Sequence, residues 1–234
     1  MRRIITAILF MLLPLGLFCQ QKGSVEAYSR EDLLSKLDMS VVYVFPSFIE
    51  GQVVYTDGTG TTARLNVCTF DNSVRFISGP DTLKLRSPRK IDLILTPEGT
   101  IVHRGGMMLE LLRDDGEVLL TERKRLRLNE PSKGGSYGSI PPSSSARTTS
   151  ADNHNMVESH SYGYLVSVSW SLNSDYSLVS AEGKVLQVGK SAFMTLFPEL
   201  KDEIKSEIKI LKTDFKKKED IVSLYDWCIS NSNK

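Results

Sequence analysis

The sequence predicts a mainly β protein, an antiparallel meander closed as a small barrel or stacked as a sandwich, with two or three short α-helices at its C-terminal end. The first observation is that apolar and polar residues alternate in short runs between residues 41 and 128, as at Ala63, Leu65 and Val67. Such alternation is typical of strands that bury one face. The second is that turn-forming pairs such as Asp57-Gly58 separate the runs. Because no long helical segments intervene, a parallel βαβ fold is disfavoured.

Residues 1–19 are expected to form a secretory signal peptide. Arg2 and Arg3 supply the positive charge, and the apolar run 4–18 is shorter than the about 20 residues that cross a bilayer. A membrane anchor is the disfavoured alternative. Cleavage after Cys19 would leave Gln20 first, whereas lipidation of Cys19 would anchor the chain, although bulky Phe18 is a poor neighbour for that reaction. The expected location is periplasmic or outer-membrane-associated.

Residues 20–40 are predicted to carry one short helix. Ser29 is a favourable N-cap, Glu31 and Asp32 place acidic groups in the first turn, and an apolar side follows. The β-rich region 41–128 begins after it. Its further alternating runs are Val74/Phe76, Leu83/Leu85, Ile91/Leu93/Leu95 and Met107/Leu109/Leu111.

Residues 129–162 are rich in Ser, Gly, Pro, Asn and Thr and are predicted to form a long flexible loop, because they offer too little apolar area to offset the entropy of ordering. Residues 163–189 return to strand patterns, with Trp170 ending one alternating run and a hairpin expected around Glu182-Gly183. We expect these strands to complete the first sheet, so that the chain is one domain with an insertion.

The tail, residues 190–234, is predicted to be helical. Ser191 is a candidate cap for a short helix ending at Leu196. Two apolar stripes at helical spacing follow, the first at Leu200, Ile204, Ile208 and Leu211 and the second at Ile221, Leu224, Tyr225 and Cys228.

Composition excludes some function classes. The formal net charge of +1 gives no reason to expect a nucleic-acid partner. Only 3 His residues are present, which is few for a metal protein. Cys68 and Cys228 are interpreted as two buried small apolar residues, although an oxidising compartment would permit a bridge.

Two motifs resemble catalytic sequences but lack the required context. Residues 134–138 match G-x-S-x-G, and Asp152, His154 and His160 follow in hydrolase order, but the flanks cannot form the strand and helix that position such a serine. Residues 183–191 resemble a phosphate-binding loop but have five residues between the glycines, and these read as a strand. The sequence therefore nominates no catalytic, cofactor-binding or metal-binding residue.

Two basic runs remain. Residues 122–127, Glu-Arg-Lys-Arg-Leu-Arg, are interpreted as a strand with one solvated face, with a surface for acidic partners as the alternative. Residues 216–218 are three lysines at a helix start, where the dipole disfavours cations. They are interpreted as a solvated linker, or as a contact for an acidic partner or lipid headgroup through peripheral membrane association.

The segments GQVVYTDGTGTTARLNV, VRFISGPDTLKL and FPELKDEIKSEIKILKTDFKKKEDIVSLYDWC resemble a family of uncharacterised exported proteins of Bacteroidota-type bacteria. The tail carries the most specific part of this resemblance, at Phe197, Pro198, Ile204, Lys205, Phe215, Asp220 and Leu224. The resemblance implies an exported β protein with a helical tail and a periplasmic or outer-membrane-associated address. It implies no activity.

The leading functional hypothesis is a non-enzymatic envelope protein that binds a ligand or partner through its β surface. One alternative is a hydrolase whose site is assembled from residues distant in sequence. Another is a lipid-anchored accessory subunit of an outer-membrane assembly.

Overall fold

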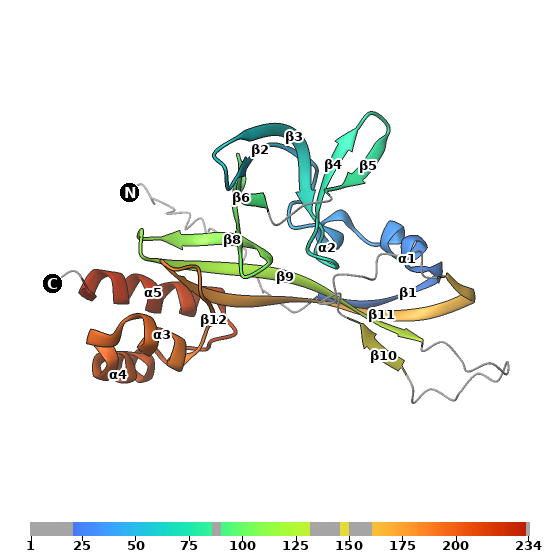
Figure 1. The fold of residues 1–234 in the computed structure, drawn as a ribbon. Helices are drawn as coiled ribbons and strands as arrows, with labels where there is room; N and C mark the ends of the chain where they lie inside the picture. The colour runs from blue at the N-terminus through green and yellow to red at the C-terminus, as the bar shows by residue number, and fades with distance from the viewer. Residues whose placement is uncertain (1–20, 86–89, 132–145, 150–160, 233–234) are drawn as a thin grey trace, which may run out of the picture.

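The computed structural model describes residues 21–85, 90–131, 146–149 and 161–232, and shows one antiparallel sheet of twelve strands with helices at both ends of the chain (Figure 1). The strand order is β1-β11-β9-β8-β7-β6-β2-β3-β4-β5, with β10 paired to β9 and β12 to β11. The strands are β1 (Gln21–Ser29), β2 (Ile49–Tyr55), β3 (Gly60–Val67), β4 (Val74–Ser78), β5 (Asp81–Lys84), β6 (Ile91–Thr96), β7 (Gly99–Arg104), β8 (Met107–Asp114), β9 (Val118–Pro131), β10 (Ala146–Thr149), β11 (Ser161–Ser180) and β12 (Val185–Gln187).

The helices are α1 (Arg30–Lys36), α2 (Met39–Val42), α3 (Lys190–Leu196), α4 (Lys201–Leu211) and α5 (Lys218–Ser232), with a short 3₁₀ turn, η2 (Pro198–Leu200). The expected mainly β fold with a helical tail is confirmed. The expected barrel is not formed, because among the described strands the sheet is open, with β1 and β5 at its two ends. None of the described helices is long and apolar enough to cross a membrane.

The two long strands β9 and β11 form the central ribbon of the molecule, pairing from Val118 with Ser180 to Asn129 with Ser169. Side chains alternate between the two faces of this ribbon. One face, here called the inner face, carries Leu120 and Leu126 of β9. Both are fully buried.

Four hydrophobic cores hold the fold together, the smallest of them formed by Val102, Leu109 and Val179. At one end of the inner face, α3–α5 pack on Leu120 through Phe193 and Leu224. At the other end, α1 and α2 cover Leu126 together with Phe70. A third core lies between the hairpins β2–β3 and β6–β7. Since β9 contributes to the first two cores, it positions both groups of helices.

The N-terminal segment is partly as predicted. Ser29 caps α1, its hydroxyl accepting from the Asp32 N–H at 3.1 Å. Residues 21–29, in a segment for which only a short helix was predicted, form β1, which pairs with β11. Strand structure in the next region begins at Ile49, because residues 39–42 form α2.

The predicted solvated side of β3 is exposed at Arg64 but buried at the end of the strand. Asn66 is fully buried, and its side chain accepts from the Phe45 N–H at 3.1 Å and donates to the carbonyls of Phe45 and Ser47 at 2.8 Å. Cys68, which continues the same alternation, is also buried. The chain after α2 therefore covers this side of the strand.

The later strands complete the first sheet, as expected. β11 pairs with β9 and β1, and the hairpin around Glu182-Gly183 is confirmed by the pairing of β11 with β12. The ends of the predicted loop 129–162 differ from the prediction, because residues 129–131, 146–149 and 161–162 belong to β9, β10 and β11. Residues 132–145 and 150–160 lie outside the described residues, as does the predicted signal peptide.

The helical tail is confirmed, with two differences. Helix α3 begins at Lys190 with Gly189 as its N-cap, so Ser191 lies inside the first turn and does not cap it. The stripe on α4 is buried only at its start, at Leu200 and Ile204, whereas Leu211 is exposed. The stripe on α5 is buried at all four positions.

Candidate functional site

The outer face of the β9–β11 ribbon is polar where it passes β1. Lys22 and Ser24 of β1 lie opposite Ser171 and Ser169 of β11. The same two serines lie opposite Arg127 and Asn129 of β9. Opposed residues share a face of a sheet, so the three strands present these side chains together.

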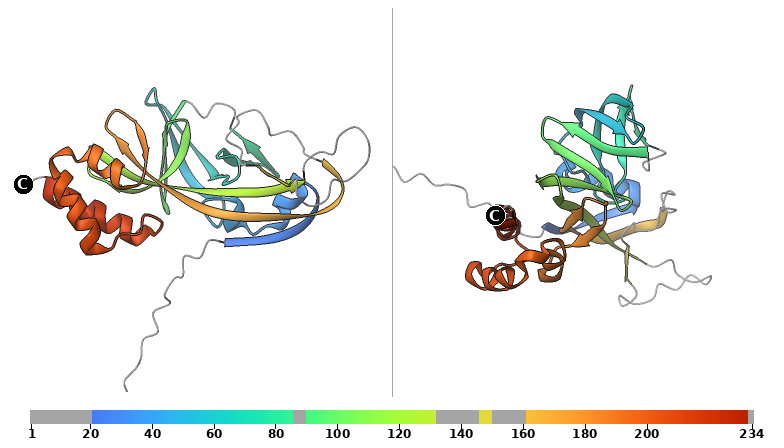
Figure 2. Two further views of the ribbon diagram at one scale, coloured as in Figure 1. Left: turned by 90° about the horizontal axis from the view of Figure 1, so that it is seen from below. Right: turned by 60° about the vertical axis from the view of Figure 1, so that its left-hand side comes forward.

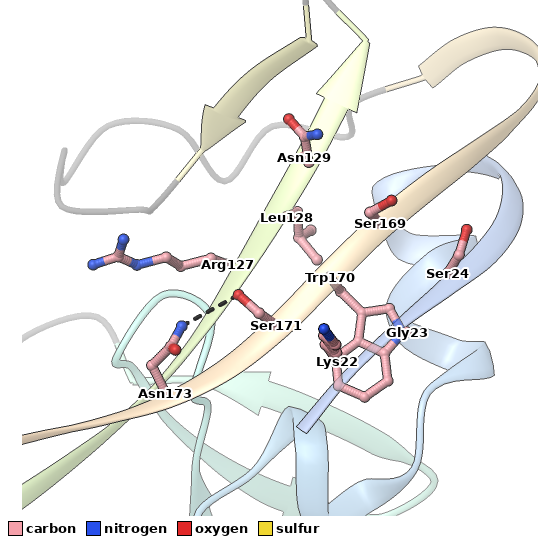
Figure 3. Close-up of a pocket in the computed structure, with 10 residues that line it drawn as sticks. All are labelled: Lys22, Gly23, Ser24, Arg127, Leu128, Asn129, Ser169, Trp170, Ser171 and Asn173. Carbon is pink, nitrogen blue, oxygen red and sulfur yellow. Dashed lines mark hydrogen bonds between the residues drawn. The ribbon is translucent and has the colours of Figure 1, made fainter. Parts of the chain in front are cut away.

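These residues line an open trough of about 740 Å³, drawn in Figure 3. Its lining is Lys22, Gly23, Ser24, Arg127, Leu128, Asn129, Ser169, Trp170, Ser171 and Asn173. In Figure 3, Arg127 extends outward from β9, and the Asn173 amide points to Ser171, to which it donates a hydrogen bond of 3.2 Å. Because the lining includes no carboxylate, His or Cys, the trough offers two cations and a row of hydroxyl and amide groups.

Arg127 is the most unusual group in this lining. Its Nε is buried and has no hydrogen-bond partner among the described residues. A buried donor without a partner costs about 1–3 kcal/mol. The Nε of its neighbour Arg125 is buried in the same way, but the Nη2 of Arg125 pairs with Asp175 at 2.8 Å. Arg127 has no ion-pair partner among the described residues, so its guanidinium is available to a ligand that brings an acceptor.

The indole of Trp170 fixes the shape of the sheet beside the trough. A Cβ at Gly23 would lie 2.9 Å from Trp170 Cε2, closer than real contacts allow. Only glycine at this position lets the half-buried indole pack across β1. The same ring contacts the core beneath α1, so the trough is built on rigid strands.

A second hollow of about 690 Å³, here called the charged cleft, lies on the inner face between the two groups of helices. Its buried Glu122 accepts from Ser174 Oγ and, at 2.8 Å, from Lys218 Nζ of α5. Burial, reinforced by the Glu122 carboxylate, raises the pKa of Tyr176 to about 12. One Glu122 oxygen thus joins β9 to β11 and the other joins β9 to α5, which favours a structural role.

The two basic runs of the sequence lie in different parts of the fold. Residues 122–127 alternate along β9, so that Lys124 faces the charged cleft and Arg127 the trough. Lys124 Nζ donates to the Val44 carbonyl at 3.2 Å and lies 3.6 Å from Glu110. Of the lysines 216–218, Lys218 is not part of a solvated linker, because it pairs with Glu122.

The cysteines behave as small apolar residues, as interpreted. Both are buried and free, Cys68 beneath α1 and Cys228 among the C-terminal helices. Burial raises the pKa of each thiol to about 12. The thiolate form needed for nucleophilic chemistry is therefore strongly disfavoured.

The catalytic-looking motifs of the sequence are only partly described by the structure. Residues 134–138 and Asp152, His154 and His160 lie outside the described residues. Residues 185–187 of the second motif form a strand, β12, as the sequence reasoning expected. Within the described part of the chain, no group of three His, Cys, Asp or Glu residues could hold a metal ion.

Sequence reasoning identified Arg127 within a basic run but missed its companions. The alternation of Ser169 and Ser171 with apolar residues was visible in the sequence. Their meeting with Lys22 could not be deduced, because β1 was not recognised as a strand. The trough therefore depends on a long-range pairing that no local pattern specifies.

Comparison with protein-family models, with curated proteins and with solved structures finds no match. The resemblance to exported Bacteroidota proteins therefore stays a prediction.

Proposed function

We propose that this protein is a non-enzymatic binding protein of the bacterial cell envelope, which holds an acidic glycan chain along the trough formed by β1, β9 and β11. The observation that carries the proposal is Arg127, whose buried Nε has no partner among the described residues while the side chain lines an open polar surface. A carboxylate on the ligand would pair with this guanidinium through charge-assisted hydrogen bonds.

The shape of the trough supports a polymer over a small enclosed ligand. Small-molecule sites enclose most of the ligand surface in a concave, largely apolar pocket. Here the polar groups lie in the open on sheet strands. Hydroxyls at Ser24, Ser169 and Ser171 and the amide of Asn129 suit a chain of repeating hydroxylated units.

The charge of the trough supports an acidic ligand. Lys22 and Arg127 are the charged residues of the lining, which gives it two positive charges although the whole chain is nearly neutral. Local excess charge of one sign raises the rate at which oppositely charged ligands are captured, and added salt weakens the effect.

Titration calorimetry with oligogalacturonate, and with a neutral malto-oligosaccharide of equal length, tests the proposal. Arg127→Gln should weaken oligogalacturonate binding roughly tenfold, since a hydrogen bond to a charged group contributes about 1.5–3 kcal/mol. Lys209→Gln removes an exposed charge on α4 and serves as the matched control, with unchanged affinity. Equal affinity for the two oligosaccharides, or no effect of Arg127→Gln, would contradict the proposal.

The envelope location is supported by the signal-peptide pattern of residues 1–19. Mass spectrometry of the mature N-terminus tests it. A chain beginning at Gln20 is expected for a periplasmic protein, and an acylated Cys19 for a lipid-anchored accessory subunit. A mature protein that retains Met1 would rule out both forms of export.

A further inference from the structure

Strand β1 has one edge without a strand partner among the described residues. It ends the sheet and pairs only with β11. Figure 2 shows it running along the rim of the sheet. Residues 21–24 are exposed. Such an edge presents a row of backbone donors and acceptors that can pair with another strand.

The backbone groups on this edge can be assigned. Lys36 Nζ donates to the Glu26 carbonyl at 3.0 Å, and the Tyr28 N–H, two residues along, donates to Asp32 Oδ2 at 3.0 Å and so points away from β11. Alternate residues of a strand direct their N–H and C=O to the same edge. The open edge therefore carries the backbone groups of Lys22, Ser24 and Glu26.

We propose that β1 pairs in antiparallel fashion with β1 of a second copy of this chain, centred on Ser24. In this register Lys22 lies opposite the partner's Glu26, and Glu26 lies opposite the partner's Lys22. Both side chains are exposed, and they lie on the same face of the strand because two residue steps separate each of them from Ser24. The segment is thus complementary in charge to itself.

The symmetry of this arrangement is that of an ordinary dimer. A two-fold axis through Ser24, perpendicular to the sheet, makes the two strands antiparallel and keeps the same face outward in both copies. Every contact then occurs twice. The two troughs come to lie on one continuous surface, because Lys22 and Ser24 line the trough in each copy.

The existing contact of Lys36 is compatible with the pairing. A carbonyl oxygen has two lone pairs, so Glu26 can accept from Lys36 and from the partner's Lys22 N–H together. The centre of the pairing carries small side chains, with Gly23 opposite the partner's Val25.

Charge reversal tests the pairing, with sedimentation equilibrium of the full chain, purified as its host processes it, as the measurement. The unmodified chain should show a monomer–dimer equilibrium. Glu26→Lys should weaken dimerisation roughly tenfold, because two attractive cross-strand pairs become repulsive. Combining Lys22→Glu with Glu26→Lys restores opposite charges and should return the affinity to near its original value.

A chain that is monomeric at all concentrations would overturn the proposal, and so would a double variant that dimerises no better than Glu26→Lys. The rescue distinguishes loss of pairing from damage to the fold. The test is also independent of the proposed function. Arg127→Gln should leave dimerisation unchanged, and Glu26→Lys removes no residue of the trough lining.

Discussion

At the scale of single residues, the buried ion pair between Arg30 and Glu130 joins distant parts of the chain. Arg30 Nε and Nη2 donate to the two Glu130 oxygens at 2.9 and 2.7 Å, and Tyr162 donates to the same carboxylate at 2.8 Å. The guanidinium also lies 5.1 Å from the centre of the Phe70 ring. These contacts bring the start of α1, the end of β9 and the start of β11 together.

Replacing Glu130 should therefore destabilise the protein. Glu130→Gln keeps the size of the side chain but leaves Arg30 as a buried charge without its counter-ion, which costs about 3–5 kcal/mol. Urea unfolding followed by tryptophan fluorescence measures the change.

Asp202→Asn is the matched control, since its pair with Lys205 is exposed and surface pairs contribute about 0–1 kcal/mol. Equal losses in the two variants would show that burial of the Glu130 pair has no energetic consequence.

At the scale of elements, one ion pair and one apolar stripe hold α5 against β9. Leu224 and Ile221 are fully buried in the core that α3–α5 share with the sheet. Tyr225 donates its hydroxyl proton to the Val118 carbonyl of β9. The pair between Lys218 and Glu122 closes the first turn of the helix onto the strand.

Lys218→Met should loosen this attachment. The variant keeps the aliphatic length but leaves the buried Glu122 carboxylate without its cation, so we expect a loss of about 3 kcal/mol. Hydrogen exchange should accelerate across residues 218–232. Lys217→Met, at an exposed neighbour, should change neither the free energy of unfolding nor the rate of hydrogen exchange. Unchanged exchange in Lys218→Met would contradict the assigned role of the pair.

The elements that sequence reasoning found and missed differ in how they are buried. The α5 stripe was predicted because one side of the helix is buried along its length. Strand β1 was missed because its exposed start, Gln21–Ser24, carries no apolar alternation. Strand β11 was divided in two because Asn173 and Ser174 interrupt its apolar pattern where the ribbon passes the charged cleft. Apolar patterns in a sequence reflect burial, so they do not predict strands at sheet edges or beside polar hollows.

The trough shows the same limit more strongly. Arg127 could be selected from its basic run, but Lys22, Ser24 and Ser171 come together only through the register of β1 on β11. Register between strands separated by well over a hundred residues depends on the whole sheet. The fold class could be predicted from local patterns, and the site could not.

At the scale of the whole molecule, β9 and β11 make the chain one structural unit. Each strand contributes to the core of the C-terminal helices and to the core beneath α1. The third core is connected to these two strands through β8 and β7. Neither group of helices has a sheet surface of its own, so disruption of the central ribbon removes the support of both.

The pairing of β1 with β11 also determines when, during synthesis, the fold can be completed. Gln21 must meet Leu172, and Ala27 must meet Val166, far along the chain. Contacts over such separations form slowly, because a long stretch of backbone has to be closed into a loop first. A ribosome therefore has to finish most of the polypeptide before its opening residues can pair. Until then they stay extended, the condition in which a chain can still be threaded through a narrow channel.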